Sequence, residues 1–78
     1  MKDQIKDLLM DLNPEVDYDN CTTLIDDRHI NSLTMVSLVA DLEDEFDIEI
    51  PAVDIVPENF NSLDAIAKLV KTLQEEED

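Results

Sequence analysis

The chain has 78 residues, enough for one small domain but too few for a large enclosed substrate cavity. Its 21 acidic and 5 basic residues give a formal net charge of −16. This balance argues against nucleic acid and anionic membranes as partners, because both are bound through Lys and Arg, and it favours proteins with a basic face. We expect a single monomeric domain over residues 1–78, not an enzyme, with an acidic frayed tail at 75–78.

Cys21 is the single cysteine, so no intramolecular disulfide can form, which fits a reducing cytoplasm. The N-terminal Met-Lys-Asp-Gln-Ile does not begin a signal peptide, and no apolar run approaches membrane-spanning length. We therefore expect a cytoplasmic protein without membrane insertion. Hydrophobic residues make up 44% of the chain and recur at regular spacing, which indicates a folded chain and not a disordered one.

Apolar residues at helical spacing predict a first helix over residues 3–12, with a stripe made of Ile5, Leu8, Leu9 and Leu12. Pro14 ends this helix because the residue before a proline avoids helical geometry. Residues 14–30 show no sustained period, which is unusual for so small a domain. Because Val16, Tyr18, Leu24 and Ile25 can anchor this stretch, we expect an ordered loop lying across a helix bundle.

A second helix is predicted to begin at Asn31 or Ser32, with Asn31 as a suitable N-cap, and to end near Phe46. Its core stripe comprises Met35, Leu38, Val39, Leu42 and Phe46. An adjacent apolar set comprises Leu33, Val36 and Ala40. Two interpretations of this set stay open: a wide core face, or a partner-contact patch rimmed by acids.

Residues 47–51 alternate like a strand but are too short and isolated to pair, so we expect an extended linker anchored by Ile48 and Ile50. Residues 53–60 should contain one short helical turn, with Pro57 at its N1 position. The last helix is predicted over residues 62–73, with the stripe Leu63, Ile66, Val70 and Leu73. The predicted fold class is all-α: a four-helix bundle with three longer helices, one short helix and a long first loop.

Residue types suited to metal or nucleophilic chemistry are sparse. One Cys and one His cannot build a structural zinc site unless carboxylates fill the remaining positions. Residues 17–28 fail as a calcium loop, since Thr22 replaces the turn glycine and Arg28 the final glutamate. We predict no specific metal site. A hydrolytic dyad of Cys21 and His29 is a remote alternative that requires the loop to bring the two together.

Ser32 stands in the first turn of the second helix, where Asn31 can already cap the helix and leave the serine hydroxyl free. The unpaired amides and positive dipole end of that turn would favour a phosphodiester on this oxygen. These arguments do not single out Ser32, because the tripeptide Asn61-Ser62-Leu63 repeats the same residues at the start of the last helix.

Asn31-Ser32-Leu33 is followed by Val36, Leu38-Val39, Leu42-Glu43 and the run Glu-Phe-Asp-Ile-Glu-Ile-Pro at 45–51. With Leu-Ile-Asp-Asp at 24–27 and Val-Pro-Glu-Asn-Phe-Asn-Ser-Leu at 56–63, this pattern covers nearly the whole chain and resembles the acyl carrier protein family. The chain departs from the family at Asn31, where Asp is usual, and at Thr34 and Ser37, where acids are common.

The resemblance implies a carrier: a phosphopantetheinyl transferase moves 4′-phosphopantetheine from coenzyme A to Ser32, beside its motif neighbour Asn31. The thiol of that arm would hold an acyl or aminoacyl group as a thioester for loading and processing enzymes with basic docking surfaces. The residues expected to bind partners are Leu33, Val36, Ala40, Glu43, Asp44 and Asp47. Fatty acyl, polyketide, amino acid and D-alanine carriers share these features. The alternative function is an unmodified acidic interaction module that uses the same helix face.

Overall fold

Four α-helices and one 3-10 turn form the regular structure of residues 2–76, the part of the chain that the computed structural model describes. The helices are α1 (Lys2–Leu12), α2 (Ser32–Phe46), α3 (Pro57–Phe60) and α4 (Leu63–Glu76), and the 3-10 turn η1 (Ala52–Asp54) precedes α3. The predicted all-α fold, with three longer helices, one short helix and a long first loop, is confirmed.

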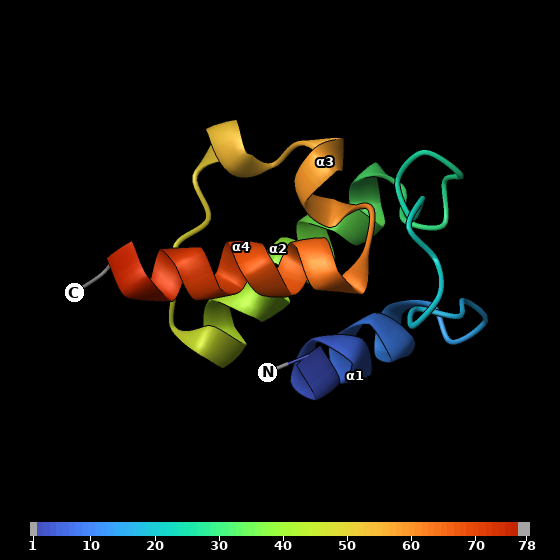
Figure 1. Cartoon of the computed structure of the whole chain (residues 1–78), viewed down its shortest axis with the longest axis horizontal. Helices are drawn as coiled ribbons and strands as arrows, with labels where there is room; N and C mark the ends of the chain where they lie inside the picture. The colour runs from blue at the N-terminus through green and yellow to red at the C-terminus, as the bar shows by residue number, and fades with distance from the viewer. Residues whose placement is uncertain (1, 77–78) are drawn as a thin grey trace.

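The helices pack around α4 (Figure 1). In this view α4 crosses in front of α2, α1 lies along one side of the pair, and α3 lies on the other side. Both α1 and α3 contact α4, and α1 also packs against α2. The loop that joins α1 to α2 lies at the end of the molecule where α2 begins, close to α3. The start of α2 is therefore bordered by segments from three parts of the chain.

The core combines residues of the predicted helical stripes with Phe60, Leu69 and buried side chains of the loops. Its fully buried aliphatic side chains come from α1, α2, α4 and the long loop: Ile5, Leu9, Leu24, Leu38, Leu42, Ile66 and Val70. Each such side chain contributes about 1.5–3 kcal/mol through the removal of apolar surface from water. Ile48 and Ile50 are also buried and anchor an extended linker, and no strand forms between residues 2 and 76, as predicted.

The loop over residues 13–31 is held by buried side chains and by hydrogen bonds. Tyr18 is 2% exposed, and its hydroxyl lies 3.0 Å from the carbonyl oxygen of Leu9 and 2.6 Å from that of Asn13. The buried Leu24 donates its backbone N–H to the carbonyl oxygen of Asn61 at 2.9 Å. These contacts satisfy polar groups that a long connection would otherwise leave unpaired, so the prediction of an ordered loop is confirmed.

The short helical turn expected within residues 53–60 forms as α3, with Pro57 at its start as predicted, and the 3-10 turn η1 is an addition. Some boundaries differ from the sequence prediction: α1 begins at Lys2 and α4 at Leu63, each one residue from the predicted start. The last helix was expected to end near Leu73, whereas α4 continues to Glu76. The physical reason is that Gln and Glu are good helix formers and no Gly or Pro follows Leu73. Positions 77–78 of the predicted frayed tail lie outside the described residues.

None of the helices formed by residues 2–76 combines the length and the apolar character that crossing a bilayer requires.

Candidate attachment site at the start of α2

Asn31 is the N-cap of α2. Its backbone is extended, with φ −89° and ψ 179°, and its side-chain Oδ1 accepts a hydrogen bond from the Thr34 N–H at 2.8 Å. Ser32 is then the first helical residue and is exposed to solvent. Since the cap is supplied by Asn31, the Ser32 hydroxyl takes no part in the side-chain hydrogen bonds formed among residues 2–76.

The second Asn-Ser-Leu tripeptide uses its serine differently. Ser62 lies one position before α4 and its Oγ accepts a hydrogen bond from the Ala65 N–H at 3.0 Å, so Ser62 is itself the cap. The Asn61 side chain accepts the backbone N–H groups of Ile25 and Asp26 at 2.9 and 3.1 Å. The two tripeptides are therefore shifted by one residue relative to their helices, and this shift occupies the Ser62 hydroxyl and leaves that of Ser32 free.

A groove of about 540 Å³ lies beside Ser32. Most of its surface is apolar, and its lining residues come from the long loop, α2 and the segment between η1 and α3: Ile25, Arg28, Ile30, Asn31, Ser32, Met35, Val36 and Ile55. Sequence patterns did not predict the groove, because one wall, at Ile55, comes from a segment far along the chain from the others, which lie within residues 25–36. One signal was available: Arg28 is the single basic residue between Lys6 and Lys68.

The adjacent apolar face of α2 does not belong to the core. Leu33 is 82% exposed, Val36 is 69% exposed, and Ala40 is also exposed. The wide-core interpretation is therefore wrong, and a face available for contact remains. Val53 in η1 is likewise 82% exposed, which the sequence analysis did not anticipate.

The three acids expected to meet partners differ in their surroundings. Asp44 is exposed. Glu43 is half-buried, and its Oε2 accepts the Ile50 N–H at 2.9 Å, which ties the linker to α2. Asp47 is exposed and ends α2 in the left-handed region, at φ 53°. Glu43 and Asp47 therefore have structural roles in addition to any contact with a partner.

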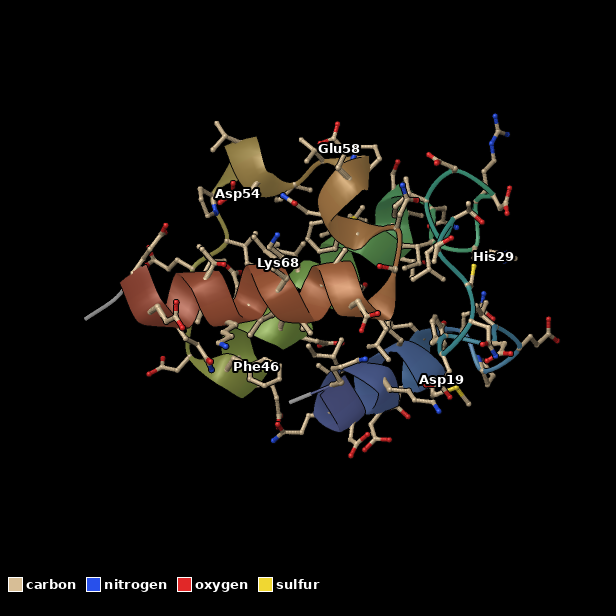
Figure 2. The ribbon with its side chains drawn as sticks, viewed as in Figure 1. Asp19, His29, Phe46, Asp54, Glu58 and Lys68 are labelled. Atoms are coloured by element: carbon tan, nitrogen blue, oxygen red, sulfur yellow. The ribbon has the colours of Figure 1, made fainter. Side chains whose placement is uncertain are left out.

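No hydrogen bond joins the side chains of Cys21 and His29 among residues 2–76, so the dyad considered from the sequence does not form there. The Cys21 Sγ lies 3.8 Å from the Thr23 Oγ, and the backbone carbonyl of His29 accepts a hydrogen bond from the Asn13 side chain at 3.2 Å. His29 lies on the loop that leads into α2, whereas Phe46 marks the opposite end of that helix (Figure 2). Across the described residues, no three His, Cys, Asp or Glu side chains gather as a metal site.

Comparisons with known proteins agree with this geometry. Residues 3–70 match the family described as the phosphopantetheine attachment site. The chain is also similar to aminoacyl carrier protein 1 of Bradyrhizobium diazoefficiens, with 41% identity over 46 residues, which is 59% of this chain. It spans about half of that relative, 51% of its length. No solved structure matches the chain.

The family match includes both Asn-Ser-Leu tripeptides and extends into α4 as far as residue 70. The all-helical fold is consistent with this family. The chain belongs to the phosphopantetheine-attachment family of carrier proteins, whose members work with partner enzymes, and its cofactor is 4′-phosphopantetheine. The structure fits this group: a serine hydroxyl without a hydrogen-bond partner among residues 2–76 faces solvent at a capped helix start, beside an open groove.

Proposed function

We propose that Ser32 carries the 4′-phosphopantetheine arm. The observation that supports this choice is the difference between the two tripeptides, because only Ser32 has its capping role taken over by a neighbour. In the modification, the Ser32 Oγ bonds to the phosphorus of coenzyme A that bears the pantetheine. The phosphoanhydride bond breaks, adenosine 3′,5′-bisphosphate leaves, and the hydroxyl proton passes to a base of the transferase. The field at the helix N-terminus favours the resulting phosphodiester.

The loaded chain would carry an acyl or aminoacyl group as a thioester on the thiol of the arm and present it to partner enzymes. The printed name of the Bradyrhizobium relative favours an amino acid among the possible cargoes. The chain itself would catalyse no step, since its role is to present the group. A reducing cytoplasm suits this chemistry because it keeps the thiol free.

The decisive experiment is intact mass spectrometry after incubation with coenzyme A, Mg²⁺ and a promiscuous phosphopantetheinyl transferase. We expect a single phosphopantetheine adduct on the wild-type chain and on Ser37→Ala, which changes an exposed serine of the same helix. Ser32→Ala should give none. An adduct that survives Ser32→Ala, or no adduct with several transferases, would contradict the proposal.

Partner enzymes would dock on the exposed face of α2. Leu33, Val36 and Ala40 supply an apolar centre there, and Glu43, Asp44 and Asp47 lie toward its C-terminal end. Such a surface suits a partner with an apolar pocket and a basic rim. We expect Val36→Asp to weaken transfer from a loading enzyme at least tenfold, whereas Met10→Asp, at a 36% exposed position of α1, should leave it unchanged.

The unmodified interaction module remains the alternative outcome of these two experiments. It predicts that Val36→Asp abolishes partner binding while Ser32→Ala changes nothing that the chain does. A carrier predicts that both substitutions abolish the delivery of cargo.

A further inference from the structure

Arg28 is the one cation among residues 2–76 that lines the groove beside Ser32. The other basic side chains lie elsewhere: Lys2 pairs with Asp64, Lys6 pairs with Asp19, and Lys68 and Lys71 belong to α4. Arg28 forms no ion pair within residues 2–76 and is exposed. In a chain with a net charge of −16, an unpaired guanidinium at this place calls for a physical explanation.

The backbone holds Arg28 in a costly conformation. Its φ is 61°, in the left-handed region, where a side chain with a Cβ is disfavoured and glycine is usual. Two backbone hydrogen bonds fix this turn, from Arg28 N–H to the Ile25 carbonyl and from Ile30 N–H to the Leu24 carbonyl, each 3.0 Å long. Asn61 ties the same turn to the start of α4. The position of Arg28 relative to Ser32 is therefore set by the fold.

We propose that Arg28 is a positioning residue for the phosphopantetheine arm: its guanidinium pairs with the phosphodiester on Ser32 and directs the arm along the groove. The inference rests on the proposed attachment to Ser32. A guanidinium presents a planar set of N–H donors that matches two oxygens of a phosphate group. The pair would also offset the negative charge that modification adds to an already acidic chain.

The test is a thermodynamic cycle on four chains, each with and without the arm: the wild type, Arg28→Gln, Arg28→Lys and Lys71→Gln. Arg28→Gln removes the charge and keeps a Cβ at the left-handed position. Lys71→Gln removes an equal charge from an exposed site on α4, away from the groove. Intact mass first confirms that each chain is fully loaded, and the melting temperature is then measured for the apo and loaded forms.

We expect loading to change the melting temperature of wild type and Lys71→Gln by the same amount. In Arg28→Gln, the change in melting temperature on loading should be less favourable than in the wild type by about 2–5 °C at low salt. This is the size expected for losing one exposed ion pair in a domain of this size. Arg28→Lys should recover part of the difference, and 1 M salt should reduce it. The same loading effect in Arg28→Gln and wild type would overturn the inference while leaving attachment to Ser32 intact.

A second measurement covers the case in which Arg28→Gln lowers the stability of the apo form. In the wild-type chain labelled with ¹⁵N, the Arg28 Nε–H resonance should shift when the arm is added, and the ³¹P resonance of the loaded chain should differ from that of loaded Arg28→Lys. An Arg28 Nε–H resonance that is unchanged by loading would contradict the contact. If no chain accepts the arm, the proposed function itself fails, which is a distinct result.

Discussion

Tyr18 connects the long loop to the end of α1 through its hydroxyl. The ring is buried, and the O–H lies within hydrogen-bonding distance of the carbonyl oxygens of Leu9 and Asn13. Tyr18→Phe keeps the ring and removes this donor. The Leu9 carbonyl still accepts the Asn13 N–H at 2.8 Å, so the loss falls mainly on the Asn13 carbonyl. We expect a loss of about 1–2 kcal/mol in the free energy of unfolding at pH 7, measured by urea denaturation. Unchanged stability would show that the loop is held by apolar contacts alone.

The same side chain predicts a pH dependence. Burial, and to a smaller extent the Cys21 thiolate, raise the pKa of Tyr18 above its usual value of 10.0. A raised pKa means that the folded state holds the proton more tightly, so this stability is present below pH 10 and is lost as the pH rises through the folded-state pKa. The stability difference between wild type and Tyr18→Phe should therefore shrink above pH 10. Lys2 and Lys6 titrate in both proteins, so comparing the two isolates Tyr18.

Asn31 caps α2 without the negative charge of the Asp that is usual at this position in the family. Substitutions at Asn31 can therefore test the cap and the charge separately. Asn31→Ala removes the acceptor of the Thr34 N–H and should cost about 1 kcal/mol. Asn31→Asp keeps the acceptor and adds a negative charge at the helix N-terminus, which is worth about 0.3–1 kcal/mol in stability. Thermal unfolding of the three chains checks both values. If Asn31→Ala had the same melting temperature as the wild type, the cap would contribute nothing to the stability of the fold.

The Asn31 cap could be predicted from the sequence because capping depends on the residues within one turn of the helix. The one-residue shift between the two Asn-Ser-Leu tripeptides could not be predicted from the sequence. It depends on the Asn61 side chain, which accepts hydrogen bonds from the backbone N–H groups of Ile25 and Asp26, more than thirty residues earlier in the chain. A tertiary contact of this kind leaves no signal in the local pattern.

At the scale of elements, α2 ends at a residue that is poorly suited to its position. Asp47 adopts φ 53°, where glycine is preferred, and its carboxylate lies at the negative end of the helix dipole. Asp47→Gly should relieve both effects and raise the free energy of unfolding by about 1 kcal/mol, or about 4–8 °C in melting temperature. Asp47→Ala removes the charge but keeps the Cβ, so it should gain much less. Equal melting temperatures for these two variants would mean that the backbone conformation carries no cost.

The longer helices were predictable because each repeats its apolar stripe over several turns, and this period specifies both the element and its buried face. The 3-10 turn η1 was not predictable from the sequence, because three residues are too few to show a period. Leu33 and Val36 could not be assigned from spacing alone, since a face at helical spacing can pack on a neighbour or remain exposed. Their exposure arises because no helix formed by residues 2–76 covers that side of α2.

At the scale of the whole molecule, the net charge of −16 opposes compaction. The two ion pairs formed within residues 2–76, Lys2 with Asp64 and Lys6 with Asp19, lie at the surface and stabilise the fold little. Salt weakens these pairs, but it also screens the far more numerous repulsions. We therefore expect 0.2–0.5 M NaCl or so, or millimolar Mg²⁺, to raise the melting temperature by about 4–8 °C. A flat or falling response would show that repulsion does not limit this fold.

The groove is a property of the whole molecule, and it could not be predicted because its walls come from the long loop, α2 and the segment after η1. The serine beside it could be predicted, since the family pattern around Ser32 is local and continuous. Ser32, and not Ser62 of the repeated tripeptide, is the serine that we propose bears the arm.

Fragmentation of the loaded wild-type chain in the mass spectrometer tests this claim most directly, because it locates the adduct without any substitution. Every fragment that carries the phosphopantetheine mass should contain Ser32, and fragments that contain Ser62 but not Ser32 should be unmodified. An adduct located on Ser62, or on any residue other than Ser32, would contradict attachment to Ser32.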